Sequence, residues 1–274
     1  MTGRIAAIAA TEFRIALRNR WVLVAVLLMM LFSLVLTAAG SAPTGALGAD
    51  RLSVVVASLT SLAVYLVPLL SLLLAFDAVA GEAERGTLPL MLTYPLSRAE
   101  LLAGKLVAHL GVLALALLAG YGLAAVVSLW ADAGAASGLA ALFRLFWSSL
   151  LLGAAFLGLG YTLSSLARRP SGAAGLVIGL WVIAVVLFDL GLLAMVVASD
   201  GGGAVGAILP AALLSNPADA FRMFNLTASE ATAAASGLGG AARSIPPMAS
   251  LGSLALWPLF GFGLALLAFR KVVP

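Results

Sequence analysis

Six apolar runs, each long enough to cross a lipid bilayer, divide this chain of 274 residues. The hydrocarbon core of a bilayer is about 30 Å thick, and a helix needs roughly 20 apolar residues to span it. Charged residues make up 9% of the chain, whereas a water-soluble domain carries about 25%. We therefore expect an all-α polytopic membrane protein, one domain over residues 1–274, with spans at about 21–39, 53–76, 106–130, 142–163, 172–198 and 250–269.

Basic residues are distributed unevenly among the segments that join these spans. An even number of spans puts both termini on one side, and the side richer in Lys and Arg faces the cytoplasm. With the N-terminus inside, the inner segments hold eleven basic residues, and the outer segments hold only Arg51, Arg144, Arg222 and Arg243. We therefore expect a bacterial inner-membrane protein with both termini cytoplasmic. Because the positive charge sorts by membrane side, it does not indicate a nucleic-acid partner.

Two segments outside the spans have distinctive sequence patterns. Residues 1–20 place basic side chains on one helix face and apolar side chains on the other, which predicts an amphipathic helix in the cytoplasmic interface. A merely solvated basic N-terminus is the alternative. Residues 199–249 form a long periplasmic loop rich in Gly, Ala and Ser, and 228–243 within it is low in complexity, as linkers are.

Residues that the chain lacks exclude several enzymes and metal sites. It has no cysteine and a single histidine, His109, so neither a thiolate site nor a multi-histidine centre can form within one chain. Gly104-Lys105 resembles the end of a phosphate-binding loop, but Leu106 stands where that motif needs Ser or Thr. No G-x-S-x-G nucleophile motif occurs. We expect neither catalytic residues nor a cofactor or metal bound by this chain.

The remaining candidates for metal or proton chemistry are weak. The methionines show no M-x-x-M spacing, and methionines in spans usually serve packing, so direct copper binding is not expected of Met29, Met30, Met195, Met223 or Met248. His109 lies near the inner end of the third span. A hydrogen-bonded or interfacial role is favoured there over a proton relay, because a lone histidine lacks the orienting partner that proton transfer needs.

The longest charged stretch lies between the second and third spans, at residues 77–105. Gly81, Gly86 and a proline interrupt the helix that would otherwise continue from the second span. Ser97 and Glu100 then form a capping box, which starts a new helix. This pattern predicts a helix, a break, a short apolar helix, a turn and a recapped helix. An ordinary solvated loop is the alternative, but it would not need four Leu and Met side chains exposed to water.

The same stretch resembles the ABC-2 family of transporter permeases. The resemblance is carried by Ala80-Gly81-Glu82, Gly86-Thr87-Leu88, Pro95, Ser97-Arg98 and Lys105. It implies a cytoplasmic coupling helix between spans 2 and 3, a homodimer, and a separate ATPase subunit that holds ATP and Mg²⁺. The residues that would couple to this ATPase are Gly81, Glu82, Glu84, Arg85, Gly86, Thr87, Leu88, Met91, Leu92 and Arg98. Glu82, Glu84 and Arg85 would supply ionic contacts, and Leu88, Met91 and Leu92 apolar ones.

Asp189 lies deep in the fifth span, where a carboxylate is costly unless it faces a bundle interior or a cavity. It can belong to a substrate path, form a hydrogen bond at a dimer interface, or make a structural contact with a neighbouring Ser, Thr or Trp. The residues alone leave these alternatives open.

The outer loop contains a segment, 217–226, that could form a short helix. We interpret it as an interfacial or re-entrant element that a periplasmic partner grips, through Asn216, Pro217, Asp219, Phe221, Arg222, Phe224 and Asn225. A helix lying passively on the lipid is the alternative.

Phe188-Asp189-Leu190 and the string from Ser215 to Leu226 resemble, within the ABC-2 family, the branch that serves nitrous oxide reductase. That resemblance implies a β-helical protein on the outside and a role in assembling the copper sites of the reductase. The alternatives are a generic ABC-2 exporter of a drug or lipid-linked molecule, and an ATP-independent membrane scaffold. A scaffold would not need the interrupted and recapped helix at 77–105.

Overall fold

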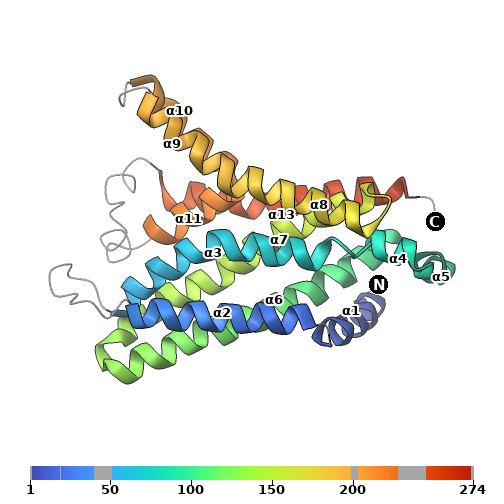
Figure 1. Ribbon diagram of the computed structural model, residues 1–274, viewed down its shortest axis with the longest axis horizontal. Helices are drawn as coiled ribbons and strands as arrows, with labels where there is room; N and C mark the ends of the chain where they lie inside the picture. The colour runs from blue at the N-terminus through green and yellow to red at the C-terminus, as the bar shows by residue number, and fades with distance from the viewer. Residues whose placement is uncertain (1, 19, 40–50, 199–202, 228–244, 273–274) are drawn as a thin grey trace.

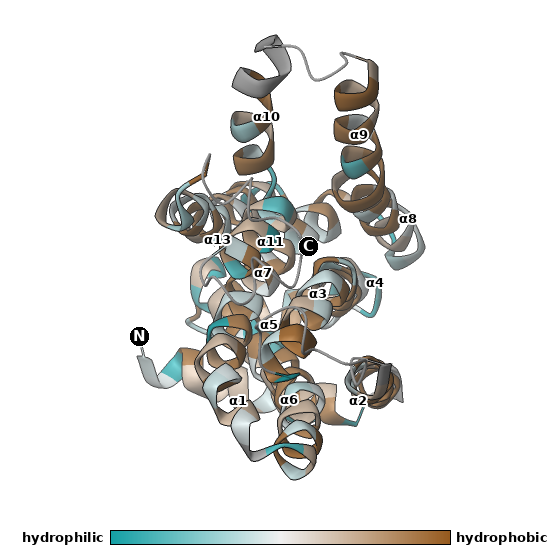
Figure 2. Ribbon diagram, turned by 90° about the vertical axis from the view of Figure 1, so that its left-hand side faces the viewer, coloured by the Kyte–Doolittle hydropathy of each residue, from teal (hydrophilic) through white to brown (hydrophobic). Residues whose placement is uncertain are grey.

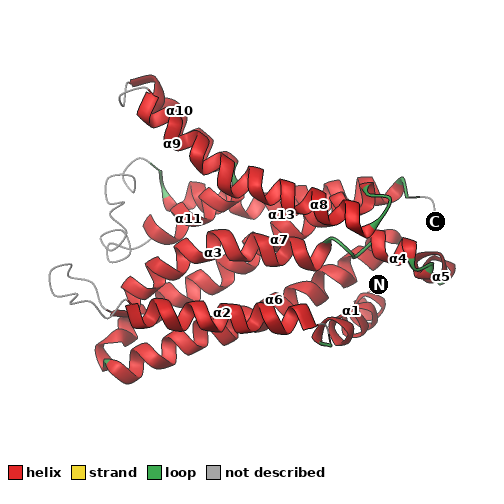
Figure 3. Cartoon of the chain, viewed as in Figure 1, coloured by secondary structure: helices red, strands yellow, loops and turns green. Residues whose placement is uncertain are grey.

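The computed structural model describes residues 2–18, 20–39, 51–198, 203–227 and 245–272. All regular structure in these ranges is helical, so the all-α expectation is confirmed. Figure 3 shows the described connections between helices, drawn in green, as short loops and turns. The helices are α1 Thr2–Leu17, α2 Arg20–Ala39, α3 Arg51–Ala75, α4 Ala80–Glu84, α5 Thr87–Thr93, α6 Arg98–Ala131, η2 Ala133–Gly138, α7 Leu139–Leu166, α8 Pro170–Trp181, η3 Val182–Leu187, α9 Phe188–Ala198, α10 Gly203–Ser215, α11 Pro217–Thr227 and α13 Pro247–Arg270.

The apolar runs form the membrane spans at the expected places. Five helical segments are long and apolar enough to cross a bilayer: 51–84, 98–131, 134–166, 170–198 and 247–270. The sixth candidate is the pair α1 and α2, which are bent by 75° relative to each other. The bend lets α2 cross while α1 turns aside, as an amphipathic helix before a span should.

The spans form one bundle in which both termini lie at the same end (Figure 1). We call this the terminal end and the opposite one the loop end. Buried side chains of α3, α6 and α7 form the centre of the core. Helix α13 packs along α7, and α2 packs along α6. Helices α1, α4 and α5 lie at the terminal end, whereas α10 and α11 lie toward the loop end (Figure 1).

The α7–α13 contact depends on two glycines that bring the backbones together. A Cβ atom at Gly158 would lie 2.6 Å from the carbonyl carbon of Gly261, and one at Gly261 would lie 2.9 Å from the carbonyl oxygen of Ala155. Small residues at such crossings allow close van der Waals packing where no hydrophobic effect drives helices together. This crossing fixes the last span on the fourth.

The fifth span leaves the bundle toward the loop end. Helix α8 continues through the π-helical turn η3 into α9, and α9 and α10 extend together away from the other helices (Figures 1 and 2). Helix α9 has no buried residue within this chain. Figure 2 shows that it is strongly hydrophobic, so its surface suits lipid or another apolar protein face.

Within the segment expected to be a long outer loop, the described residues 203–227 fold as helices α10 and α11. Helix α10 is apolar but, at 13 residues, too short to span. The expected linker, 228–243, lies outside the described residues.

Candidate functional site

The expected sequence of helix, break, helix, turn and recapped helix is present between the second and third spans. Helix α4 ends at Glu84, and Gly86, just before α5, has a left-handed backbone with φ of 69°, where glycine carries no steric cost. Helix α5 follows. The capping box closes as expected, because the backbone N–H of Glu100 donates to Ser97 Oγ at 3.1 Å and the Ser97 N–H donates to Glu100 Oε2 at 2.9 Å. We call residues 77–97 the elbow.

Ser164 of α7 holds the start of the elbow. Its hydroxyl donates to the carbonyl of Phe76 at 2.7 Å and accepts the backbone N–H groups of Val79 and Ala80, both at 3.0 Å. These bonds satisfy backbone groups at the break between α3 and α4, which a buried helix end requires. The role of Ser164 could not be predicted from the sequence, because a single serine in a span gives no signal of which groups it will hydrogen-bond.

Arg98 holds the far side of the elbow on the end of α13. Its guanidinium donates to the carbonyls of Phe269 and Val272, the latter at 2.9 Å, and lies 5.2 Å from the centre of the Phe269 ring. We expected Arg98 to contact the ATPase. Its described contacts are instead within this chain, because the carbonyl groups at a helix C-terminus attract a cation.

A buried ionic cluster, Glu12–Lys105–Glu82, joins the elbow to α1. Lys105 Nζ lies 2.6 Å from Glu12 Oε1 and 2.5 Å from Glu82 Oε1, and the Lys105 residue is 2% exposed. Glu82 is 6% exposed, so the structure differs from the expected surface contact: its carboxylate compensates a buried cation. The sequence contains one indication of this cluster, because Glu12 is an acidic residue on the apolar face of α1, beside Ala9 and Ala16.

Helix α1 also packs directly on the elbow and on α6. Arg4 donates to the carbonyl of Pro95 at 2.6 Å, so the first turn of α1 reaches the end of the elbow. A Cβ atom at Gly104 would lie 2.5 Å from Ile8 Cγ2, which shows how closely α1 and α6 approach. The interfacial helix is therefore part of the terminal-end structure.

The structure divides the other expected coupling residues into exposed and buried ones. Glu84, Arg85 and Gly86 are exposed, and Arg85 pairs with Asp77 at 3.0 Å. Leu88 is fully buried, so it packs in the elbow and presents no apolar contact to a partner. Gly81 is also buried, whereas Thr87, Met91 and Leu92 are half-buried.

Two exposed side chains of the elbow were not among the expected coupling residues. Leu90 and Tyr94 are 65% and 66% exposed on and just after α5. Together with Glu84 and Arg85 they form what we call the docking face, which combines apolar and ionic groups. The sequence pattern alone does not distinguish these two exposed side chains from neighbouring apolar side chains that are buried.

His109 is buried and hydrogen-bonded, as favoured from the sequence. Its Nδ1 atom lies 2.8 Å from the hydroxyl oxygen of Tyr161 on α7. This pair lies one helical turn beyond Lys105 and ties α6 to α7 beneath the ionic cluster.

At the loop end, α11 is a short helix enclosed by the bundle. It packs on α3, α7 and α13. Six of the seven expected partner-contact residues are buried: Asn216, Pro217, Asp219, Phe221, Phe224 and Asn225. The structure differs from the expectation here, because it places these side chains in the interior of the bundle; their contact with a periplasmic partner stays a prediction. The alternative, a helix lying passively on the lipid, does not match the structure, because the polar groups of α11 find their partners inside the chain.

Arg222, the seventh, is the polar centre of this region. Its guanidinium lies 2.7 Å from Asp189 Oδ2 and 3.0 Å from Asp219 Oδ1. The Tyr65 hydroxyl donates to Asp189 Oδ2 at 3.4 Å. Asp189 therefore makes a structural contact within the chain, but its ionic partner is Arg222 and not the Ser, Thr or Trp that the structural alternative named. Because Asp189 and Arg222 are about one-quarter exposed, the pair remains partly accessible.

Amide groups fix both ends of α11. Asn216 Nδ2 donates at 2.6 Å to the carbonyl of Ala184, which lies within the π-helical turn η3. Asn225 Nδ2 donates to the Ser148 hydroxyl at 2.9 Å. Such buried hydrogen bonds stabilise one position of the helix, because leaving any of these groups unpaired is costly. Among the described residues, no three His, Asp or Glu side chains are grouped so as to hold a metal ion.

The sequence matches known proteins over nearly its whole length. The family profile described as ABC-2 family transporter protein matches residues 6–272. A probable ABC transporter permease protein NosY of Pseudomonas aeruginosa is 47% identical over 268 residues, 96% of this chain and 97% of that protein. A probable ABC transporter permease protein NosY of Stutzerimonas stutzeri is 42% identical over 266 residues, 94% of each.

These matches include the elbow, all the spans and α11, so they concern the whole bundle rather than a local motif. Permeases of ABC transporters are the membrane components of transport machines and are not themselves catalytic. The chain belongs to the ABC-2 family and is a permease subunit of an ABC transporter.

Proposed function

We propose that this permease works as a homodimer that couples a separate cytoplasmic ATPase, similar to NosF, to a periplasmic β-helical protein, similar to NosD. In this proposal the complex supports assembly of the copper sites of nitrous oxide reductase. ATP and Mg²⁺ bind to the ATPase and not to this chain. The similarity to two NosY proteins along at least 94% of the chain supports the choice of this branch.

The observation that carries the coupling proposal is the attachment of the elbow on three sides. Ser164 holds it on α7, Arg98 holds it on α13, and Lys105 joins it to α1. A force applied to α5 therefore reaches several helices at once. A loop attached only at its two ends would bend under such a force and transmit little of it.

The docking face is the part of the elbow that an ATPase can reach. Leu90 and Tyr94 offer apolar area, and Glu84 and Arg85 offer one charge of each sign. In protein–protein interfaces, a few apolar side chains surrounded by polar or charged groups often supply most of the binding energy. This assignment replaces the contacts first expected of Glu82, Leu88 and Arg98.

Affinity purification of the tagged permease from native membranes in mild detergent tests the proposal. The unmodified chain should bring down an ATPase together with a repeat-rich periplasmic protein. Leu90→Asp and Tyr94→Asp should release the ATPase, whereas Arg14→Glu, an exposed change on α1, should not. Recovery of an ATPase alone would favour the generic exporter. Recovery of no ATPase would contradict coupling and favour the scaffold.

The second copy is proposed on the basis of the family and of α9. Helix α9 buries no residue within this chain, which leaves an apolar surface for another protein face or for lipid. A purified complex whose mass corresponds to one permease per two ATPases would contradict the homodimer.

A further inference from the structure

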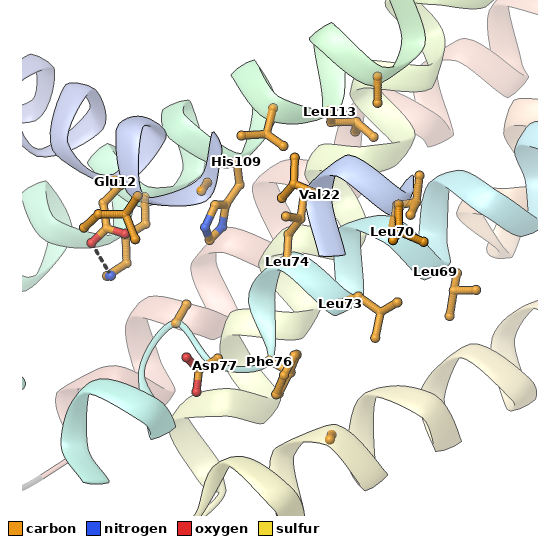
Figure 4. Close-up of a pocket in the computed structure, with 18 of the residues that line it drawn as sticks. Glu12, Val22, Leu69, Leu70, Leu73, Leu74, Phe76, Asp77, His109 and Leu113 are labelled. Atoms are coloured by element: carbon orange, nitrogen blue, oxygen red, sulfur yellow. Dashed lines mark hydrogen bonds and ion pairs between the residues drawn. The ribbon is translucent and has the colours of Figure 1, made fainter. Parts of the chain in front are cut away.

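A cavity of about 580 Å³ lies between α1, α2, α3 and α6 at the terminal end (Figure 4). Pockets that bind small molecules usually have volumes of about 300–1,000 Å³, so its size suits a ligand. Most of its wall is apolar and comes from Val22, Met29, Leu70, Leu73, Leu74 and Leu113. A bound water needs two to four polar partners, and this part of the wall offers none.

The apolar part of the cavity borders the bilayer. Val24 and Leu28 of α2 and Leu73 of α3 line it and are also exposed on the surface of the bundle. Helix α2 packs extensively on α6 but only lightly on α3. An acyl chain can therefore enter sideways between α2 and α3 without leaving an apolar environment.

The other end of the cavity is polar. Figure 4 shows Glu12, His109 and Asp77 at one end and Leu69, Leu70 and Leu73 at the other. The charged groups at the polar end are Glu12, Asp77, Glu82, Arg85 and Lys105. Three carboxylates and two cations give one net negative charge when all are ionised, so this end favours a ligand that carries a positive group.

Two of these charged groups have capacity left for a ligand. Glu82 Oε2 is buried and has no hydrogen-bond partner among the described residues, although Oε1 pairs with Lys105. A buried carboxylate oxygen without a donor is costly, and an ammonium group would satisfy it. The Arg85 side chain is 56% exposed and its one described ion pair is with Asp77, so other guanidinium N–H groups can bind a phosphate.

We propose that this cavity binds one phospholipid with a primary ammonium group, phosphatidylethanolamine. One of its two acyl chains lies between α2 and α3, its ammonium lies by Asp77 and Glu82, and its phosphate lies by Arg85. The lipid would fill the gap that α2 leaves on α3 and would touch the elbow at Asp77. An anionic lipid fits less well, because the polar end already carries a net negative charge.

Native mass spectrometry of the delipidated full-length permease, titrated with defined lipids, tests this proposal. We expect one phosphatidylethanolamine per chain, bound about fivefold or more tightly than phosphatidylglycerol, the difference expected of roughly one ionic interaction. Leu73→Trp, which fills the mouth, should weaken binding about tenfold or more, because two buried methylenes correspond to about that factor. Leu118→Trp, on the exposed face of α6 away from the cavity, is the matched control.

A second set of variants keeps the test decisive. Val24→Trp blocks the mouth from α2 and replaces Leu73→Trp if that variant does not fold. Asp77→Asn should reduce the preference for the ammonium lipid while leaving one lipid bound. Equal binding of both lipids to the unmodified chain would overturn the proposal. So would unchanged binding in both tryptophan variants, or a lipid-free dimer in which Leu73→Cys cross-links to the second copy.

Discussion

At the scale of single residues, the most informative group is Lys105. A lysine at 2% exposure is stable only when its charge is compensated, and Glu12 and Glu82 do this from two different helices. The ionic cluster therefore joins α1, α4 and α6. None of the three residues, taken alone in the sequence, indicates that the cluster forms.

Replacing Lys105 should therefore be severe. Lys105→Met leaves two buried carboxylates without a cation and should lower the free energy of unfolding by about 3–5 kcal/mol. The double variant Glu12→Gln/Lys105→Met should cost less than the sum of the single changes, because the two groups interact directly. Thermal unfolding of the purified permease in detergent measures both. Strict additivity would show that Glu12 and Lys105 are not paired.

Replacing Arg222 should lower the free energy of unfolding more than replacing Asp189. Arg222→Met leaves Asp189 and Asp219 both without their cation and should destabilise the protein by about 3–5 kcal/mol. Asp189→Asn should cost less, because Arg222 keeps Asp219 at 3.0 Å. The same unfolding measurement ranks the two. A larger loss for Asp189→Asn would contradict the described pairing.

At the scale of helices, what could be predicted from sequence follows the range of the interactions. The spans depend on composition within about twenty residues, and the elbow depends on glycines and a capping box three residues apart, so both were predictable. The burial of α11 was not. It depends on Ser148 and Asp189, which lie 77 and 33 residues from their partners Asn225 and Arg222. The bond of Arg98 to the end of α13 was not predictable for the same reason, since its partner Val272 is 174 residues away.

The α7–α13 crossing makes a prediction at this scale. Gly261→Ala would place a Cβ atom 2.9 Å from the backbone oxygen of Ala155 and should destabilise the protein by about 1–3 kcal/mol through overpacking. Gly263→Ala, two residues along the same helix, meets nothing within 4 Å and should be neutral or stabilising. Thermal unfolding of the two variants side by side separates packing from helix propensity. Equal melting temperatures would contradict the close crossing.

At the scale of the whole molecule, the two ends of the bundle are held together by different contacts. The terminal end ties α1, the elbow, α7 and α13 together by ionic and backbone contacts, and the loop end encloses α11 among α3, α7 and α13. Helices α7 and α13 take part in both sets of contacts, so they are the elements most directly able to relate movement at one end to movement at the other.

The proposed orientation can be tested because the chain contains no cysteine. Single-cysteine variants at Glu84 in the elbow and Ala136 in η2 both place the thiol at an exposed position. In intact spheroplasts, a membrane-impermeant maleimide should label Ala136→Cys only, and Glu84→Cys should react after lysis. The reverse pattern would place the elbow outside and contradict the assignment from basic residues.

The central claim is that ATP acts on the spans through the elbow. The most direct measurement is the distance between spin labels on Thr93→Cys of two copies, in the permease reconstituted with its ATPase. Thr93 is exposed at the end of α5. The account predicts one distance without nucleotide and a clearly different one in the ATP-trapped complex. The same distance in both states, with the ATPase bound and hydrolysing ATP, would contradict it.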